Sequence, residues 1–199
     1  MKRTMIVLAL SAFIAAALAL PASGQLVVSG GGTAYLGAVG LMPGGGVQVE
    51  DWLSVSEDHA SSGLMLGLGL EYIALTTQYT RTPGSGWILP FTLKYGFIVG
   101  KNLVLGLGAG AAVVLNDTDL VDSSGYYYAT SVVGGAPFAN GSLYLFVSPH
   151  LNLQFTLRAG ALFNEAGTVP FLGAQVLLGY YIELPRPSPA PESDDESDY

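Results

Sequence analysis

One short polar stretch contains residue types that acyl-transfer enzymes use. Residues 57–62, with the sequence EDHASS, bring an acid, a histidine and a serine close together. A serine nucleophile needs a base within hydrogen-bond reach, and His59 and Ser61 are near each other along the chain. Nothing in this spacing orients one side chain toward the other. We therefore interpret both as solvated loop residues and expect no catalytic residues.

A second polar stretch offers oxygen ligands. Residues 116–122, NDTDLVD, supply four Asn or Asp side chains, a ligand type that Ca²⁺ uses. The stretch lacks the glycine and the terminal glutamate of an EF-hand loop. The chain also has no cysteine, which excludes thiolate metal sites and disulfide bonds. We therefore predict no metal site and no cofactor.

Charged residues inside strongly apolar segments form the third candidate site. Two acids and two bases of this kind, flanked by leucine, glycine and aromatic residues, are Glu71, Lys94, Arg158 and Glu183. If they share one enclosed space, they can form a network of ion pairs. The alternative is a gated pore in which Lys94 or Arg158 sets selectivity. Both hypotheses depend on the elements that position these residues.

The chain begins with the features of a secretory signal peptide. Lys2 and Arg3 precede an apolar stretch over residues 5–20, and a proline and small residues follow it. The apolar stretch is shorter than the roughly 20 residues of a membrane-spanning helix. We predict cleavage between Gly24 and Gln25, which leaves five basic residues against fifteen acidic ones. That balance argues against nucleic acid as a partner.

After the signal, apolar residues recur at every second position rather than at helical spacing. In residues 64–71, LMLGLGLE, four leucines share one face of a strand, and Met65, two glycines and Glu71 share the other. Such runs exceed the average strand of about 5–6 residues and suit a tilted membrane-spanning strand of about 9–11. No turn residue marks a break at Tyr72, so a single strand over residues 63–80 is an alternative to two. We predict eight strands, at residues 33–42, 63–71, 73–80, 87–98, 103–115, 138–148, 151–163 and 169–184.

The predicted connections alternate between short and long. Short turns are expected at residues 100–102 and 149–150, long loops at 43–62 and 116–137, and shorter loops at 81–86 and 164–168. Tight turns on one side and loops on the other are typical of an outer-membrane β-barrel. Aromatic residues near strand ends suit the two membrane interfaces, and the outward ones are Tyr79, Trp87, Phe97 and Tyr180.

The strand face opposite the leucines indicates what surrounds the strands. In a soluble sandwich or lipocalin-like barrel, the main alternative, that face would be rich in Lys, Glu and Thr. Here it is mostly glycine, which disfavours strands unless space is short. Inside a narrow barrel, glycine leaves room for Tyr144, Phe146 and Tyr181. We predict that the leucines face lipid, because the reverse would expose Arg158 to hydrocarbon at a cost of about 2–4 kcal/mol.

Over residues 33–184 the chain resembles the small eight-stranded outer-membrane barrels of Gram-negative-type bacteria, of the OmpA, OmpX and OmpW type. The resemblance rests on the export signal, the eight amphipathic strands and the alternation of leucine with glycine. It implies insertion by the barrel assembly machinery, which reads a signal at the end of the last strand. Gly179, Ile182 and Leu184 match the glycine and the two apolar marks of that signal. Leu177 stands where the signal has a polar residue.

These expectations describe an antiparallel up-and-down transmembrane β-barrel over residues 33–184. A signal peptide at 1–24 and a short lead at 25–32 precede it. Residues 185–199 are Pro-rich and acidic, and we expect them to form a disordered periplasmic tail.

The expected function is a structural or interaction role in the outer membrane, as a monomer in contact with outer-membrane lipids. Surface contact would use loops made acidic by residues that include Glu50, Asp51, Glu57 and Asp58. The first alternative is a narrow channel for small solutes or ions. The second follows from the resemblance, because some barrels of this size modify lipids: an acyl hydrolase or transferase that depends on His59.

Overall fold

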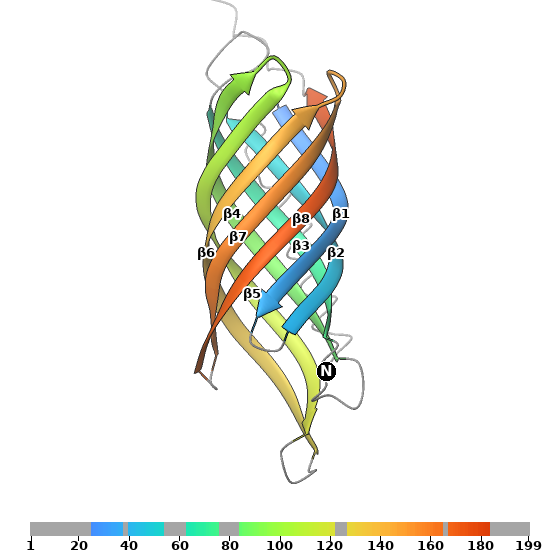
Figure 1. The fold of residues 1–199 in the computed structure, drawn as a ribbon, viewed down its shortest axis with the longest axis vertical. Helices are drawn as coiled ribbons and strands as arrows, with labels where there is room; N and C mark the ends of the chain where they lie inside the picture. The colour runs from blue at the N-terminus through green and yellow to red at the C-terminus, as the bar shows by residue number, and fades with distance from the viewer. Residues whose placement is uncertain are drawn as a thin grey trace, which may run out of the picture.

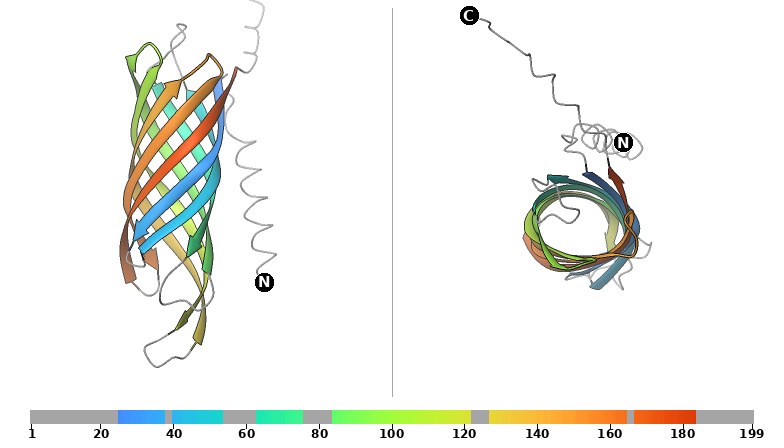
Figure 2. Two further views of the ribbon diagram at one scale, coloured as in Figure 1. Left: turned by 45° about the vertical axis from the view of Figure 1, so that its right-hand side comes forward. Right: turned by 90° about the horizontal axis from the view of Figure 1, so that it is seen from above.

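Eight strands close into one barrel (Figure 1). The computed structural model describes residues 25–37, 40–53, 63–75, 84–121, 127–164 and 167–183. The strands are β1 Gln25–Gly37, β2 Gly40–Leu53, β3 Gly63–Leu75, β4 Gly84–Gly100, β5 Leu103–Val121, β6 Tyr127–Phe146, β7 Leu151–Asn164 and β8 Gly167–Glu183. Each pairs antiparallel with its neighbours in sequence, and β8 pairs with β1 to complete the ring seen in Figure 2. The predicted fold class, an antiparallel up-and-down β-barrel of eight strands, is confirmed, and the predicted signal peptide lies outside the described residues.

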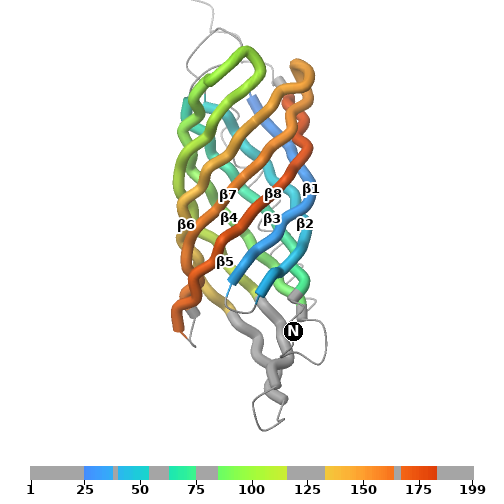
Figure 3. Tube along the Cα trace, in the orientation of Figure 1, coloured from blue at the N-terminus to red at the C-terminus, as the bar shows by residue number. Residues whose placement is uncertain are grey.

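The strands cross the barrel obliquely (Figure 3). Following paired residues once round the ring from Val27 leads through every strand and returns to β1 at Gly37. This stagger and the number of strands together set the diameter, and eight strands enclose little more than their own side chains. The lumen is therefore a space that inward-pointing residues fill.

The strand boundaries differ from the sequence prediction, most of all in the first part of the barrel. The predicted strand at residues 33–42 covers the end of β1 and the start of β2, and β1 already begins at Gln25. Residues 25–32 pair with both β2 and β8, so the predicted N-terminal lead is part of the barrel. Residues 63–75 form β3 without a break at Tyr72. The predicted total of eight is right because two errors cancel. The one strand predicted at 33–42 falls on two strands, β1 and β2, and the two strands predicted at 63–71 and 73–80 both fall on β3 within the described residues.

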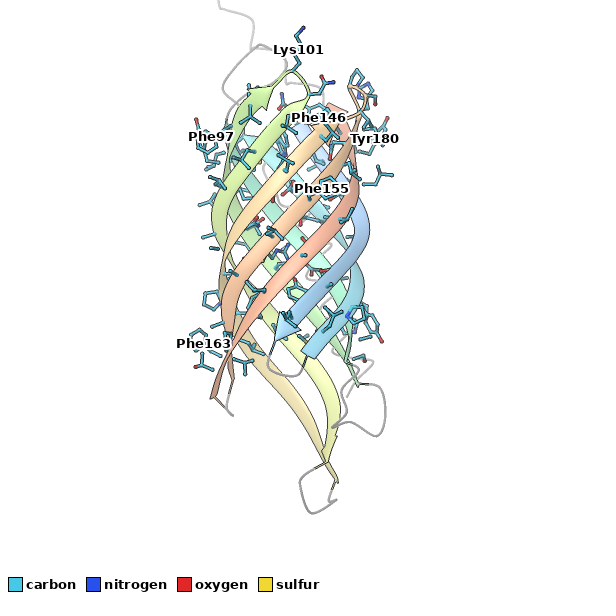
Figure 4. All side chains as sticks on the ribbon, in the orientation of Figure 1. Phe97, Lys101, Phe146, Phe155, Phe163 and Tyr180 are labelled. Carbon is cyan, nitrogen blue, oxygen red and sulfur yellow. The ribbon has the colours of Figure 1, made fainter. Side chains whose placement is uncertain are left out.

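The connections also differ from the prediction. The barrel end at which β1 begins and β8 ends carries the turn at Lys101–Asn102 and residues 147–150. We call it the terminal end, and the opposite end, near Phe163, the far end (Figure 4). β2 ends and β3 begins at the terminal end, the side predicted to have only tight turns, and residues 54–62 between them lie outside the described residues. Most of the predicted loops at 43–62 and 116–137 lie in strands.

The leucine faces point outward, as predicted. On β7, Leu157 is 68% exposed while its neighbour Arg158 is 2% exposed, and on β3 Leu64 is exposed while Met65 is buried. Outward Phe97 and Tyr180 lie near the terminal end (Figure 4), which is the predicted position of interfacial aromatic residues. Tyr79 falls outside the described residues. No helix in the described part of the chain is long and apolar enough to span a membrane.

Glycines that point inward are needed for two different reasons. At Gly173 an added Cβ would lie 2.5 Å from the Tyr35 ring, so glycine there makes room for a large lumenal side chain, as predicted. At Gly108 and Gly160 the added Cβ would lie 2.0 and 2.3 Å from carbonyl oxygens of the neighbouring strands, those of Leu93 and Pro137. These glycines are needed where two backbones approach closely.

We predict that Gly108→Ala destabilises the barrel by about 1–3 kcal/mol, because β4 and β5 must move apart to admit the methyl group. Gly32→Ala is the matched control, since its added Cβ has nothing within 4 Å. It should leave the free energy of unfolding unchanged or slightly higher. Urea unfolding of both variants in lipid vesicles measures the difference, and equal effects would contradict the close-approach explanation.

Candidate functional site

The candidate site is a belt of polar side chains in the middle of the lumen. Alternate residues of β1–β4 and β6–β8 point inward there, and each side chain is less than a tenth exposed. Its members are Ser29, Thr33, Gln48, Glu50, Glu71, Thr92, Lys94, Asn140, Ser142, Asn152, Gln154, Thr156, Arg158 and Gln175. Four of them are charged, two acids and two bases, so the belt is neutral as a whole.

The first ion pair joins β2 to β4 across the lumen. Lys94 on β4 donates hydrogen bonds through Nζ to Glu50 Oε1 and to the Tyr144 hydroxyl. The Tyr144 hydroxyl lies 3.0 Å from both carboxylate oxygens of Glu50, to which it donates. The ammonium group also lies 5.1 Å from the centre of the Tyr144 ring. Three strands, β2, β4 and β6, no two of which are neighbours in the ring, are thereby tied together.

The second ion pair joins β3 to β7. Arg158 Nη1 donates to Glu71 Oε1 at 2.5 Å and to the Tyr35 hydroxyl at 2.9 Å. Tyr35 in turn donates to Glu71 Oε2 at 2.6 Å. The Arg158 guanidinium lies 5.2 Å from the centre of the Phe138 ring. This group repeats the composition of the first: a cation, a carboxylate and a tyrosine hydroxyl that contacts both.

Gln48 connects the two groups. Its Nε2 donates to Glu50 Oε1 at 2.6 Å, and its Oε1 accepts from Arg158 Nη2 at 3.4 Å. The network therefore runs without a break from Tyr144 to Tyr35 through both ion pairs. A buried ion pair needs further hydrogen bonds to offset the loss of hydration, and the tyrosines and Gln48 supply them here.

Apolar layers lie at both ends of the polar belt. Toward the terminal end, the Trp52 ring packs edge-on against Tyr144, Phe146 and Tyr181, with centroids 5.3, 5.9 and 6.3 Å away. Buried Val27, Met65 and Val104 complete this cluster. Toward the far end, a second buried cluster consists of Tyr35, Ile73, Ile88, Ala112, Val114, Ala136 and Phe138. A charge moving along the lumen would have to cross both layers.

The structure brings together three of the four charged residues singled out from the sequence. Glu71, Lys94 and Arg158 are all in the lumen, whereas the Glu183 side chain lies outside the described atoms. From the sequence we predict Glu50 and Asp51 in an acidic outer loop. Both are in β2 and buried, and Glu50 is the partner of Lys94, so that assignment is wrong. The alternation of apolar and polar residues over Val47, Gln48, Val49 and Glu50 indicates a strand here, with Gln48 and Glu50 on the same face.

The other candidate residues are only partly described. His59, Ser61 and the loop acids Glu57 and Asp58 lie outside the described residues, as do the side chains of residues 116–121. Within the described part of the chain, no group of three His, Asp or Glu side chains could hold a metal ion. In the candidate assembly signal, Gly179 points inward beside Asn152, Ile182 is half-buried, and Leu184 is outside the described residues.

The arrangement ties strands together from inside the barrel. Glu50 and Glu71, the two carboxylates of the network, each contact a cation and a tyrosine hydroxyl, and the four charged groups of the network are shielded from solvent. The hydrogen bonds link β1, β2, β3, β4, β6 and β7 from inside, in addition to the ladder between neighbouring strands. Its chemistry is that of an internal cross-link.

No protein-family model and no curated protein matches the chain. Solved structures of small outer-membrane barrels do. Neisserial surface protein A (NspA) superposes with a TM-score of 0.56 at 10% identity, over 82% of this chain and 98% of that one. OprG of Pseudomonas aeruginosa gives 0.52 at 11%, over 81% and 97%. Ail, the attachment invasion locus protein of Yersinia pestis, gives 0.51 at 14%, over 80% and 99%. At such identities the likeness concerns the fold.

We predict that Arg158→Met lowers the free energy of unfolding by about 3–5 kcal/mol, because it leaves the Glu71 carboxylate buried without its cation. The double variant Arg158→Met with Glu71→Leu should recover much of this loss, since no uncompensated charge remains. Leu157→Ala, on the outward face of the same strand, is the control for a change in β7. Urea unfolding in lipid vesicles gives all three values. Additive losses in the double variant would contradict the direct coupling of the pair.

Proposed function

We propose that this chain is an integral protein of a bacterial outer membrane and is surrounded by lipid. Its outer wall presents large apolar side chains that are mostly 40–68% exposed, while Lys94 and Arg158 point inward. Such a wall is suited to hydrocarbon and would aggregate in water. The three similar structures, two of them titled as surface or outer-membrane proteins, support this location.

We further propose a structural or interaction role, with the barrel acting as a sealed, monomeric anchor. The observation that carries this proposal is the lumen, in which a neutral, cross-linked belt lies between two apolar layers. The names of two similar proteins, Neisserial surface protein A and the attachment invasion locus protein, support a role at the cell surface. The orientation we propose places the terminal end and the tail in the periplasm, with insertion by the barrel assembly machinery.

A narrow channel is the second candidate. The feature that favours it is the continuous polar network from Tyr144 to Tyr35. Lys94 and Arg158, the two cations that would set selectivity, are each paired with a carboxylate. Apolar side chains cover each end of the belt. Conduction would therefore require the ion pairs to separate and both layers to open. The lipid-modifying enzyme stays a hypothesis that depends on His59.

We predict that residues 25–199, refolded in detergent micelles, migrate differently on a denaturing gel before and after boiling. A closed barrel has no unpaired strand edge along the ring, so it stays compact until heated. The boiled sample is the control for the unfolded chain. If the protein instead remained folded and monomeric after complete removal of detergent, the apolar wall would not face lipid.

We predict that the folded protein carries no steady ion current across a planar lipid bilayer, because its lumenal charges are paired and capped. The informative variants are Lys94→Glu, inside the lumen, and Lys101→Glu, at an exposed turn outside it. A steady wild-type current would contradict the sealed anchor. If its ion selectivity also changed with Lys94→Glu but not with Lys101→Glu, the result would support the narrow channel.

A further inference from the structure

The mouth of the lumen at the terminal end has an exposed apolar residue on its β4 side. Ile98 follows Lys94 by four residues and is in the same inward phase of the strand, yet it is 43% exposed whereas Lys94 is 1% exposed. A β-bulge comes directly after it, because Ile98 pairs with Val104 while Gly100 already pairs with Leu103. Bulges end regular pairing and re-aim side chains. Ile98 thus presents an apolar surface at the entrance of the lumen.

Aromatic rings complete the rim of this terminal mouth. Trp52, Phe146 and Tyr181 pack edge-on, with ring centres 5.9, 6.3 and 6.5 Å apart. Phe146 and Tyr181 are only half-buried, and Figure 4 shows Phe146 at this end of the barrel. If the terminal end faces the periplasm, as proposed above, this apolar rim meets water. Exposed apolar surface of that kind is typical of a docking site.

The C-terminal segment of the chain begins beside this mouth. β8 ends at Glu183, which pairs with Gln25 at the start of β1. Residues 185–191, PRPSPAP, have proline at every second position, and five acidic residues follow within 192–198. Proline and the residue before it favour extended backbone, so such a segment loses little conformational freedom when it binds. Aromatic-lined surfaces bind proline-rich segments in the polyproline II conformation.

The segment is long enough to cross the mouth. Strands about 4.8 Å apart and tilted by about 40° give a ring of eight a diameter of about 16 Å. At about 3.1 Å per residue, residues 185–191 span about 22 Å in the polyproline II conformation. β8 and β4 are opposite each other in the ring, so a segment that crosses from β8 reaches the turn after β4. Exposed Lys101 lies at that turn and projects beyond the strands (Figure 4).

We propose that residues 185–191 form a strap across the terminal mouth, with prolines against Tyr181, Phe146 and Ile98, and that the acidic residues 192–198 bind Lys101. The charges at the end of the strap are complementary, since the acidic run meets an exposed base. The inference rests on the proposed function, because the rim needs a cover only where the terminal end faces water. It gives residues 185–191, which the sequence alone predicts to be disordered, a bound conformation over the apolar layer of the lumen.

A spin label tests where the tail lies. The chain has no cysteine, so Ser193→Cys provides a single site for a nitroxide in the protein of residues 25–199 folded in micelles. The strap predicts that the label reduces the NMR signals of Lys101 and Asn102, across the mouth, more than that of His150, whose carbonyl accepts a bond from Tyr181 of β8. Reduction of the nitroxide should restore the signals. A free tail stays near its attachment on β8 and affects His150 at least as strongly as Lys101, and that order overturns the strap.

Two neighbouring residues provide a matched test of the mouth as the binding surface. Phe97 and Ile98 are both 43% exposed, but only Ile98 is in the inward phase of β4. In the labelled protein, Ile98→Ser should restore the Lys101 signal, because the prolines lose an apolar contact, while Phe97→Ser should leave it reduced. Lys101→Glu should restore the Asn102 signal by repelling the acidic run. Equal effects of Ile98→Ser and Phe97→Ser overturn the proposal, provided that the gel shows both variants folded.

The gel and bilayer measurements separate this inference from the proposed function. A folded barrel without current, in which the label acts most strongly at His150, overturns the strap and keeps the sealed anchor. The mouth would then be left to residues 54–62, which connect β2 and β3, or to a second molecule. Steady current together with the strongest effect at Lys101 overturns the sealed anchor and keeps the strap.

Discussion

A closed ring of eight tilted strands leaves a lumen that side chains must fill, and every charge placed in it must find its partner there. The barrel meets this constraint with two similar groups, each made of a cation, a carboxylate and a tyrosine hydroxyl. Gln48 joins them, so four charges form one neutral network. The remaining features of the interior follow from the room and the hydrogen bonds that this network requires.

Glycine is the means by which the backbone accommodates the network. A lumen of this width cannot hold a tyrosine, an arginine and a bulky residue at one level unless a neighbour has no side chain. Gly173 therefore lies under the Tyr35 ring, and Gly106 lies beside Tyr144, where an added Cβ would be 3.2 Å from the ring. Gly108 and Gly160 have a different role, because they let the backbones of adjacent strands approach closely. Glycine thus makes room for large lumenal side chains and also lets adjacent strands approach closely enough to pair.

The sequence predicted the barrel because alternation is a strong signal wherever leucine faces lipid. It placed Glu71, Lys94 and Arg158 on inward positions, since each alternates with apolar residues over a long run. It failed over residues 25–53, where the glycine triplets at 30–32 and 44–46 interrupt the alternation and look like turns. Because β2 was not predicted, Glu50 and Gln48 were not placed in the lumen. Glu50 was therefore not identified as the partner of Lys94. Pairing across the lumen depends on register and stagger, which local patterns do not contain.

The buried charges matter more for specifying the fold than for stabilising it. Replacing a buried ion pair with apolar residues is often neutral or stabilising, so stability alone gives no reason to keep Lys94 and Arg158 inside. A barrel in lipid faces a different problem, because its outer wall is already apolar. If the lumen were apolar too, a shift of one residue in register would exchange the two faces of a strand at little cost. With Arg158 on one face and Leu157 on the other, the same shift would, in the membrane that we propose, place an arginine in hydrocarbon and break its bond to Glu71. The ion pairs thus help to determine which face of β2, β3, β4 and β7 turns inward.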